Sequence, residues 1–400
     1  MITPQTLKGF RDFLPDQATK REWVIGKIKK VFALFGFDPL ETPALEYAET
    51  LMGKYGTEAD KLMYLFKDNG GRNVGLRYDQ TVPLSRVISQ YQHELVSPFK
   101  RYQMQPVWRA ENTQKGRYRE FLQCDIDTIG SDSPLADAEI IACSLSVLKT
   151  LGCDNVSMVI NDRTLFNDLN LSKKAIIIID KLDKIGKDEV IRQLNEDGVD
   201  GKTIFDTLAS AKKTDRLEKI VSYLADMGFE EHAQFRFTPF LARGLDYYTS
   251  TIFELKVGDE LSLAGGGRYD ELIGQFSGTA TPAVGLAFGF DRLMEYLQTN
   301  NLLPETKTKT TVLVTIFSPE LVANSIAIVH QLREARIAAE ISLTDETKLD
   351  KQLKYADKKG IPYVLIQGPE EIAKGVVQLK NMKERTSIVI AVDKLIAELT

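Results

Sequence analysis

Two predicted β-hairpins constrain the fold of this 400-residue chain more than any other feature. In the first, Met63–Phe66 and Val74–Tyr78 flank the turn sequence Asn69-Gly70-Gly71. In the second, Phe99–Arg109 precedes a short loop and Tyr118–Ile129 follows it. Successive hairpins favour an antiparallel sheet over a parallel, doubly wound one. The sequence therefore predicts an α+β core built on an antiparallel sheet.

Two common phosphate-binding signatures are absent from the sequence. No Gly-x-Gly-x-x-Gly opens a helix after a predicted strand, and no Gly-Lys-Ser/Thr of the Walker type occurs. A nucleotide site of the Rossmann or P-loop kind is therefore disfavoured.

The length and composition predict more than one domain. Four hundred residues with 43% hydrophobic and 27% charged content exceed what one core usually fills. A strongly charged segment with helical apolar periodicity interrupts the β-rich part of the sequence. Further along, a Lys/Thr-rich stretch precedes a new alternation of predicted strands and helices. We predict a first domain over residues 1–304 with a helical subdomain inserted at 172–231, a linker at 305–311 and an α/β domain at 312–400. The helical subdomain is either a helical bundle on the surface or a part that binds the acceptor end of an RNA.

The N-terminal part begins with a predicted amphipathic helix over Gln17–Phe35, ended by Gly36. A short strand over Phe37–Leu40 should follow. Because the next proline, Pro43, cannot donate to a sheet, that strand must end there or lie at an edge.

Composition also limits the class of protein. The three cysteines are far apart and form no Cys-x-x-Cys pair, so buried reduced thiols are expected. No apolar run of about 18 residues and no signal-peptide pattern occur, which predicts a cytoplasmic protein. The net charge is −5, yet residues 97–119 carry six cations and one anion. That window is either a solvated loop or a binding surface for anions.

The segment Arg243–Tyr248 carries the most specific chemistry. It contains an arginine, two adjacent tyrosines and a glycine, and Gly265–Gly267 follows shortly after. An arginine keeps its charge and makes paired hydrogen bonds to anionic oxygens, while glycines allow a ligand to approach the backbone. This combination predicts a site for a small polar ligand beside phosphate or carboxylate groups.

Together with Leu76–Leu84 and Val107–Asp127, this segment resembles the histidyl-tRNA synthetases, and the resemblance extends over nearly the whole chain. It implies a class II synthetase core, in which the N-terminal helix and the strand that follows would form a homodimer interface. Residues 312–400 resemble the anticodon-binding domain shared by the histidyl, threonyl, prolyl and glycyl synthetases. The implied function is an ATP-dependent histidine–tRNA ligase, with L-histidine, ATP, Mg²⁺ and tRNA(His) as its ligands.

The resemblance also assigns roles on the ATP side. A carboxylate must attack the α-phosphorus, so fixed cations have to offset the repulsion between two anions. The catalytic cations would be Arg109 and Arg243. Glu111 would orient the nucleotide and is the possible magnesium ligand, Arg117 would reach the distal phosphates, and Arg292 would contact the γ-phosphate and adenine.

On the histidine side, an ammonium group and an imidazole must both be desolvated, and each unmatched polar group costs about 1 to 3 kcal/mol. The resemblance supplies partners for the amino-acid backbone and for the imidazole. The assigned residues are Asp79 and Thr81 for the α-amino group, Gln123 for the backbone, Asp127 and Tyr248 for the imidazole, Tyr247 for the pocket wall and Arg243 for the carboxylate.

Recognition of the tRNA acceptor end would fall to the loop after Arg109, with Gln114, Lys115 and Arg119 as candidates. The sequence departs from many bacterial members at Asp79, where glutamate is frequent, and at Asn112-Thr113, where Arg-Pro is frequent. The shorter carboxylate keeps its charge, so the departure in the loop bears more on tRNA contacts than on adenylation.

Two other interpretations remain at this stage. One is a non-catalytic relative, the histidine-binding regulatory subunit of histidine biosynthesis, which lacks the terminal domain and usually loses the motif arginines. The other is a class II synthetase for a different amino acid. Pyrophosphate exchange tested with each of the twenty amino acids discriminates among the three.

Overall fold

The structure is a computed structural model that describes residues 2–52, 62–112, 118–243, 247–258, 261–305, 307–343 and 348–399. The chain separates into two compact units. The first unit contains residues 1–12 and 25–302, and the second contains 13–24 and 303–400. The predicted boundaries at 304, 311 and around the helical insertion stay predictions. In the described part of the chain, no helix combines the length and the apolar character needed to cross a membrane.

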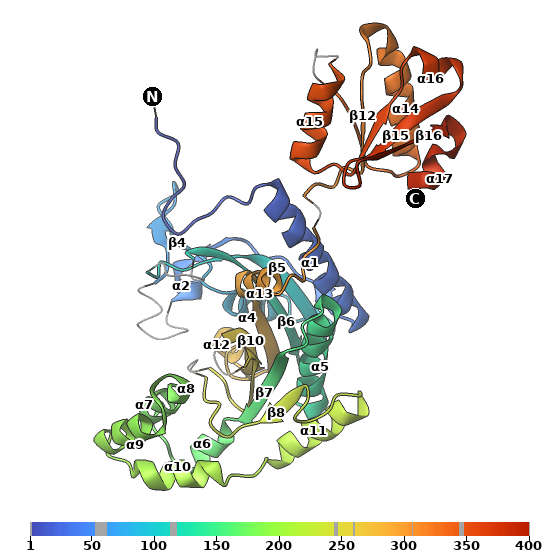
Figure 1. Cartoon of the computed structure of the whole chain (residues 1–400). Coiled ribbons are helices and arrows are strands. Elements are labelled where there is room, and N and C mark those ends of the chain that lie inside the picture. Colours follow the sequence, from blue (N-terminus) through green and yellow to red (C-terminus); the bar gives the residue numbers. More distant parts are fainter. Residues whose placement is uncertain are drawn as a thin grey trace. The chain divides into compact units, whose positions relative to one another are not determined.

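The first unit is built on an eight-stranded sheet with the order β1-β5-β6-β11-β10-β9-β7-β8 (Figure 1). Its strands pair antiparallel except for the β1–β5 and β7–β8 pairs. The strands are β1 Asp38–Pro39, β5 Phe99–Trp108, β6 Glu120–Ile129, β7 Val156–Asp162, β8 Phe235–Phe237, β9 Thr251–Val257, β10 Leu261–Arg268 and β11 Ala283–Gly289. The predicted antiparallel core is confirmed, and both predicted hairpins form. Strand β1 lies at the edge of the sheet.

The other predicted hairpin belongs to a small three-stranded sheet with the order β2-β4-β3. Its strands are β2 Leu45–Tyr47, β3 Leu65–Lys67 and β4 Asn73–Leu76. Helices pack around both sheets, and α5 contacts β6, β7 and β11. The remaining helices of the unit outside the helical segment are α1 Pro15–Leu34, shared with the second unit, α2 Ala48–Leu51, α4 Thr81–Gln90, α5 Pro134–Leu151, α6 Thr164–Asp168, α12 Gly274–Ser277 and α13 Phe290–Thr299.

The segment predicted to be helical consists of five helices. They are α7 Lys173–Ile179, α8 Leu182–Ile185, α9 Lys187–Glu196, α10 Gly201–Ala209 and α11 Asp215–Asp226. Apolar residues of α7, α9 and α10 share a core with Val159 of β7 and Ile252 of β9, and α11 packs on α5. Tyr248 belongs to the same core. The helical segment is thus packed into the same core as the predicted histidine-binding tyrosine.

The second unit contains a five-stranded mixed sheet with the order β13-β12-β14-β15-β16. The first three strands of that order are parallel, and β15 and β16 are antiparallel. The elements are β12 Val312–Val314, η1 Pro319–Leu321, α14 Val322–Glu334, β13 Ala339–Ile341, α15 Leu349–Lys359, β14 Tyr363–Ile366, α16 Pro369–Ala373, β15 Val376–Asn381, β16 Thr386–Ala391, η2 Val392–Lys394 and α17 Leu395–Leu399.

Side-chain alternation in β12 explains why helices cover both faces of this sheet. Val312 and Val314 pack with the apolar residues of α14, whereas Leu313 packs with Ala356 of α15. Successive side chains of a strand point to opposite faces, so three consecutive apolar residues serve two cores. Helix α15 ends at Gly360, whose φ of +78° is in the left-handed region that glycine favours. The predicted α/β architecture is confirmed.

Candidate active site

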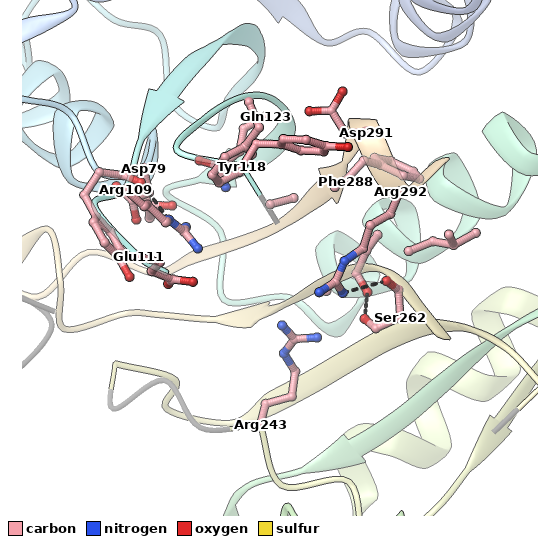
Figure 2. A pocket seen from close by; sticks show the side chains of 18 of the residues that line it. Asp79, Arg109, Glu111, Tyr118, Gln123, Arg243, Ser262, Phe288, Asp291 and Arg292 are labelled. Carbon is pink, nitrogen blue, oxygen red and sulfur yellow. Dashed lines mark hydrogen bonds between the residues drawn. The ribbon is translucent and has the colours of Figure 1, made fainter. Parts of the chain in front are cut away.

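A cavity of about 400 Å³ opens in the first unit, on residues from both predicted arginine-rich segments (Figure 2). Its lining comes from the β4–α4 junction, from the end of β5 and the start of β6, from the segment before β9, from β10, and from the β11–α13 junction. The lining residues are Tyr78, Asp79, Thr81, Arg109, Glu111, Tyr118, Phe121, Gln123, Arg243, Tyr247, Ser262, Leu263, Ala264, Gly265, Ala287, Phe288, Gly289, Asp291 and Arg292.

Most of the predicted site residues meet in this cavity. Those that line it are Asp79, Thr81, Arg109, Glu111, Gln123, Arg243, Tyr247 and Arg292. Asp127 and Tyr248 are buried behind its wall and do not line it. Arg119 is described but also lies outside the lining, whereas Gln114, Lys115 and Arg117 fall outside the described residues. The two arginines predicted to be catalytic therefore share one cavity.

Strand β6 supplies a row of polar side chains because residues two apart point to the same face. Gln123, Asp125 and Asp127 form this row, while Cys124 and Ile126 are fully buried on the other face. The neighbouring residues of β11 are Gly285, Ala287 and Gly289, paired in register with Asp127, Asp125 and Gln123 respectively. A Cβ at Gly285 would lie 1.9 Å from Asp127 Oδ1. Small residues on β11 thus leave room for the polar row.

Asp127 is held by two buried partners that the sequence did not single out. Its Oδ2 lies 2.7 Å from Arg101 Nη2, and Tyr269 donates a hydrogen bond to its Oδ1. Arg101 is its cross-strand neighbour in β5 and is fully buried. Burial raises the pKa of Asp127, while Arg101 and Tyr269 act against that rise by favouring the carboxylate. Asp127 is therefore a fixed acceptor close behind the cavity wall.

Three tyrosines connect Asp127 with the cavity. The ring of Tyr247, which lines the cavity, lies 4.8 Å from the ring of Tyr248 and 6.1 Å from the ring of Tyr269. Burial raises the pKa of all three hydroxyl groups, so each stays protonated and can donate a hydrogen bond. A polar ligand that passed Tyr247 would meet the tyrosine hydroxyl groups as donors and the carboxylate of Asp127 as an acceptor.

Asp79 and Gln123 add further polar groups to the cavity lining. Asp79 follows β4 and accepts a hydrogen bond from the backbone N–H of Val82 at 3.1 Å, so it caps the first turn of α4. Within the described ranges, Gln123 Oε1 is buried and accepts no hydrogen bond. A buried amide oxygen without a donor is costly, and a ligand N–H would satisfy it.

Arg109 enters the cavity just after β5 and is held by aromatic rings. Its guanidinium carbon lies 4.3 Å from the centre of the Tyr78 ring and 5.1 Å from that of Phe121. Its Nε donates to the carbonyl oxygen of Tyr78 at 3.2 Å. Such stacking orients a guanidinium and leaves its charge intact.

Arg243 reaches the cavity from the segment before β9. Its φ of +43° is a left-handed backbone, which costs a non-glycine residue about 1 kcal/mol and is found at ligand sites. A Cβ on Gly265 would lie 1.6 Å from Arg243 Nη1, so this glycine is what allows the guanidinium to cross β10. Nη1 lies 3.2 Å from Glu254 Oε1. In the described part of the chain, the buried Nε of Arg243 donates to no group.

The glycine run Gly265–Gly267 forms the last part of β10, just before its final residue Arg268, and is paired with β9 on one side and β11 on the other. Larger side chains would not fit there, because a Cβ on Gly266 would lie 2.1 Å from the carbonyl oxygen of Gly285 and one on Gly267 would lie 2.6 Å from that of Thr251. The glycines thus serve close strand packing as well as ligand access.

Arg292 lies in the first turn of α13, as predicted, and donates to the carbonyl oxygen of Ser262 at 3.1 Å. In Figure 2 it faces the cavity across from Arg109. Its neighbour Asp291 forms an ion pair of 2.8 Å with Arg11, whose guanidinium stacks 3.2 Å above the Tyr118 ring. The N-terminal segment therefore joins two parts of the cavity wall.

Several of these residues were not predicted from the sequence. Tyr78, Ser262 and Asp291 line the cavity, and Arg101, Glu254 and Tyr269 hold predicted site residues from behind. Tyr78 and Asp291 stand beside predicted residues in the sequence, which was a usable signal. Arg101 and Glu254 act across strands, and only the register of the sheet reveals them. Tyr269 directly follows β10.

Arg119, predicted to meet the tRNA acceptor end, makes contacts within the chain. Its Nε donates to the carbonyl oxygen of Glu111 at 3.2 Å, and its backbone N–H donates to that of Gly9. It therefore contacts the segment that carries Glu111. Its contact with tRNA stays a prediction.

Comparison with known proteins identifies the family. A family model described as Histidyl-tRNA synthetase matches residues 9–185 and 171–293, and one described as Anticodon binding domain matches residues 311–400. The chain belongs to the histidyl-tRNA synthetase family. It is 37% identical to the histidine–tRNA ligase of Bacteroides fragilis over 99% of each chain. It is 38% identical to that of Rhodopirellula baltica, over 97% of this chain and 95% of the relative.

A solved structure in this family has the same architecture. The crystal structure of histidyl-tRNA synthetase from Nostoc sp. PCC 7120 matches with a TM-score of 0.89 and 29% identity, covering 100% of this chain and 99% of that one. The family resemblance inferred from the three sequence segments is confirmed.

Proposed function

We propose that this chain activates histidine with ATP to form histidyl adenylate and then esterifies the 3′ end of tRNA(His). The observation that carries the proposal is the shared cavity of Arg109 and Arg243, beside a row of buried polar side chains. Family membership and the matched anticodon-binding model support it. Because the relatives from Bacteroides fragilis and Rhodopirellula baltica, matched over nearly their whole length, are histidine–tRNA ligases, the non-catalytic regulatory alternative is not favoured.

Adenylate formation needs charge compensation more than it needs proton transfer. The histidine carboxylate attacks the α-phosphorus while pyrophosphate leaves, so two anionic groups approach each other. Arg109 would hold the α-phosphate, and Arg243 would bridge that phosphate and the carboxylate. Both guanidinium groups are already fixed by contacts in the chain, so little reorganisation is needed when the substrates bind.

Three further residues would complete the ATP contacts. Arg292 would meet the γ-phosphate and adenine, Glu111 would orient the nucleotide, and Arg117 would reach the distal phosphates. The described residues contain no group of three His, Cys, Asp or Glu side chains placed to hold a metal ion. In nucleotide sites Mg²⁺ takes one or two carboxylates plus phosphate oxygens and water. Glu111 is the proposed protein ligand, and bound Mg²⁺ would offset phosphate charge.

Histidine specificity is assigned to the polar groups behind Tyr247. Asp79 and Thr81 would bind the α-amino group, and Gln123 would bind the amino-acid backbone. Asp127 and Tyr248 would bind the two imidazole nitrogens. Both are buried, so an amino acid without matching polar atoms would leave them unpaired, at about 1 to 3 kcal/mol for each group.

We further propose that the protein is a cytoplasmic homodimer. The small sheet β2-β4-β3 and α1 leave large apolar side chains on the surface of the single chain, and such exposure is typical of a subunit interface. These side chains are Leu34, Leu45, Tyr47, Leu65 and Phe66. Sedimentation equilibrium would give twice the chain mass of 44.9 kDa if the proposal holds.

The decisive test of function is ATP–pyrophosphate exchange with each of the twenty amino acids. We expect exchange with histidine only, followed by charging of tRNA(His) and of no other tRNA. Exchange with a different amino acid would replace the proposed substrate. Histidine binding without exchange would support the regulatory alternative.

A further inference from the structure

Strand β9 carries two charged side chains on one face, next to the predicted catalytic Arg243. Glu254 and Lys256 are two residues apart, so they point to the same side of the strand. Glu254 Oε1 lies 3.2 Å from Arg243 Nη1, and its Oε2 lies 3.8 Å from Lys256 Nζ. Lys256 also forms an ion pair with Asp183 of helix α8. One carboxylate is therefore shared between two cations.

The sheet register places Glu254 where it can act on Arg243. Glu254 of β9 is the direct cross-strand partner of Gly265 of β10. The guanidinium of Arg243 occupies the space that a side chain at Gly265 would fill. The glycine makes room, and the acid beside it gives the guanidinium a fixed partner.

The contact is partly shielded from water. The side chains of Arg243, Glu254 and Lys256 are 21%, 17% and 15% exposed. A charge-assisted hydrogen bond in such surroundings is stronger and more directional than one on an open surface. Asp183 is 54% exposed, so its pairing with Lys256 is screened more by solvent. Solvent screening of these ion pairs therefore increases outward from Arg243.

The two carboxylate oxygens of Glu254 contact different cations, and this arrangement preserves positive charge in the cavity. A carboxylate bound to Arg243 alone would compete with the anionic substrates for the guanidinium. Lys256 takes part of the charge on Glu254, while the buried Nε of Arg243 keeps its donor capacity in the described part of the chain. Glu254 can thus orient the guanidinium without cancelling its effect.

We propose that Glu254 is a positioning residue for adenylate formation, which holds the Arg243 guanidinium in its cavity-facing orientation while Lys256 and Asp183 hold Glu254. This role rests on the proposed function, in which Arg243 contacts the histidine carboxylate and the α-phosphate. Glu254 touches no substrate itself.

The test is a double-mutant cycle that combines Glu254→Gln with Arg243→Met. Adenylate formation is measured in single turnover with excess enzyme and followed over hours, so that slow variants stay measurable. We expect Glu254→Gln to lower the rate about 10- to 100-fold in the otherwise unaltered protein, as loss of preorganisation does. In the Arg243→Met background the same change should have no further effect, because Glu254 acts only through Arg243.

Three results would overturn the positioning role: an equal loss in both backgrounds, a faster rate, and an unchanged rate. An equal loss in both backgrounds would make Glu254 a merely structural residue, and a faster rate in Glu254→Gln would make it a competitor of the substrate. If the unaltered protein shows no histidine-dependent exchange, the proposed function itself fails. If that exchange is normal and Glu254→Gln matches it, only the positioning role fails.

Controls separate position from folding. Glu189→Gln removes the same charge from an exposed pair with Arg192 on α9, and we expect an unchanged rate. Lys256→Met should lower the rate less than Glu254→Gln, by about 2- to 5-fold, because it loosens Glu254 only indirectly. Circular dichroism melting checks that each variant folds. If Glu254→Gln does not fold, Glu254→Asp and Lys256→Met decide, and rates equal to the unaltered protein in both would overturn the role.

Discussion

The two arginines proposed to be catalytic are fixed in different ways. Arg109, which follows β5, lies over the rings of Tyr78 and Phe121 and donates to a carbonyl oxygen. Arg243, which precedes β9, pairs with the carboxylate of Glu254. Among the described residues, one cation is thus held by uncharged groups and the other by an acid.

This difference has consequences for the electrostatics of the site. Aromatic faces orient a guanidinium and leave its full charge for the phosphate. A carboxylate fixes direction more strongly but offsets part of the charge, which suits a residue that must meet two anionic groups without trapping either. The stacked arginine should therefore depend on its planar shape, and the paired arginine should depend on its counter-ion.

Lysine substitution tests this comparison with the largest expected effects. Arg109→Lys should lower kcat for pyrophosphate exchange about 100- to 1000-fold, because an ammonium group cannot stack on the two rings or present a fork to phosphate. Arg243→Lys should lose less, about 10- to 100-fold, since an ammonium group can still pair with Glu254. Steady-state exchange kinetics at saturating ATP and histidine measure both. A larger loss at position 243 would contradict the proposed difference between the two arginines.

Loss of one stacking ring should have a smaller effect at the same place. Phe121→Leu removes one of the two faces around Arg109, and a cation–π contact of about 1 kcal/mol predicts a fall of about 5-fold in kcat/KM for ATP. The KM for histidine should stay unchanged. A change confined to the histidine KM would show that Phe121 supports the other half of the cavity.

The sequence predicted the fold well where local signals were strong. The hairpins, the helix ended by Gly36 and the α/β pattern after residue 312 each follow from apolar periodicity and turn residues. Short strands that pair parallel across long distances, such as β8 with β7, carry no such signal and were not predicted.

The site was predictable to the extent that it resembles a family. Arg109 and Arg243 were placed by motif, and both line the cavity. Arg101 was counted only as one cation of a basic segment, yet it is fully buried against Asp127. Glu254 looked like an ordinary strand residue. Both act through cross-strand register, which composition and spacing do not encode.

Asp127 and Arg101 form a second acid–arginine pair, and the pH dependence of the KM for histidine tests its role. Arg101 favours the ionised form of Asp127, so Arg101→Met should raise its pKa further and let it take up a proton at higher pH. Because the ionised form is the proposed imidazole partner, the KM for histidine should rise as pH falls, and this rise should begin at higher pH in the variant. We expect about a 3- to 5-fold difference at mildly acidic pH, as one weakened charged hydrogen bond predicts. The KM for ATP serves as the control and should not change.

The smallest effect is expected at Arg119, which, like Arg109, donates to carbonyl oxygens. Arg119→Ala should weaken charging of tRNA(His) about 2- to 5-fold, as loss of one rim contact does, and leave adenylate formation nearly unchanged. Parallel assays of pyrophosphate exchange and aminoacylation measure the ratio. Equal loss of both activities would assign Arg119 to bracing Glu111 rather than to tRNA.

A crystal structure with a non-hydrolysable histidyl-adenylate analogue would show whether the two arginines bind the reacting groups together. We expect the guanidinium groups of Arg109 and Arg243 both to lie within about 3 Å of oxygens at the acyl–phosphate link. Finding the analogue in another cavity, or finding either guanidinium turned away from that link, would contradict this expectation.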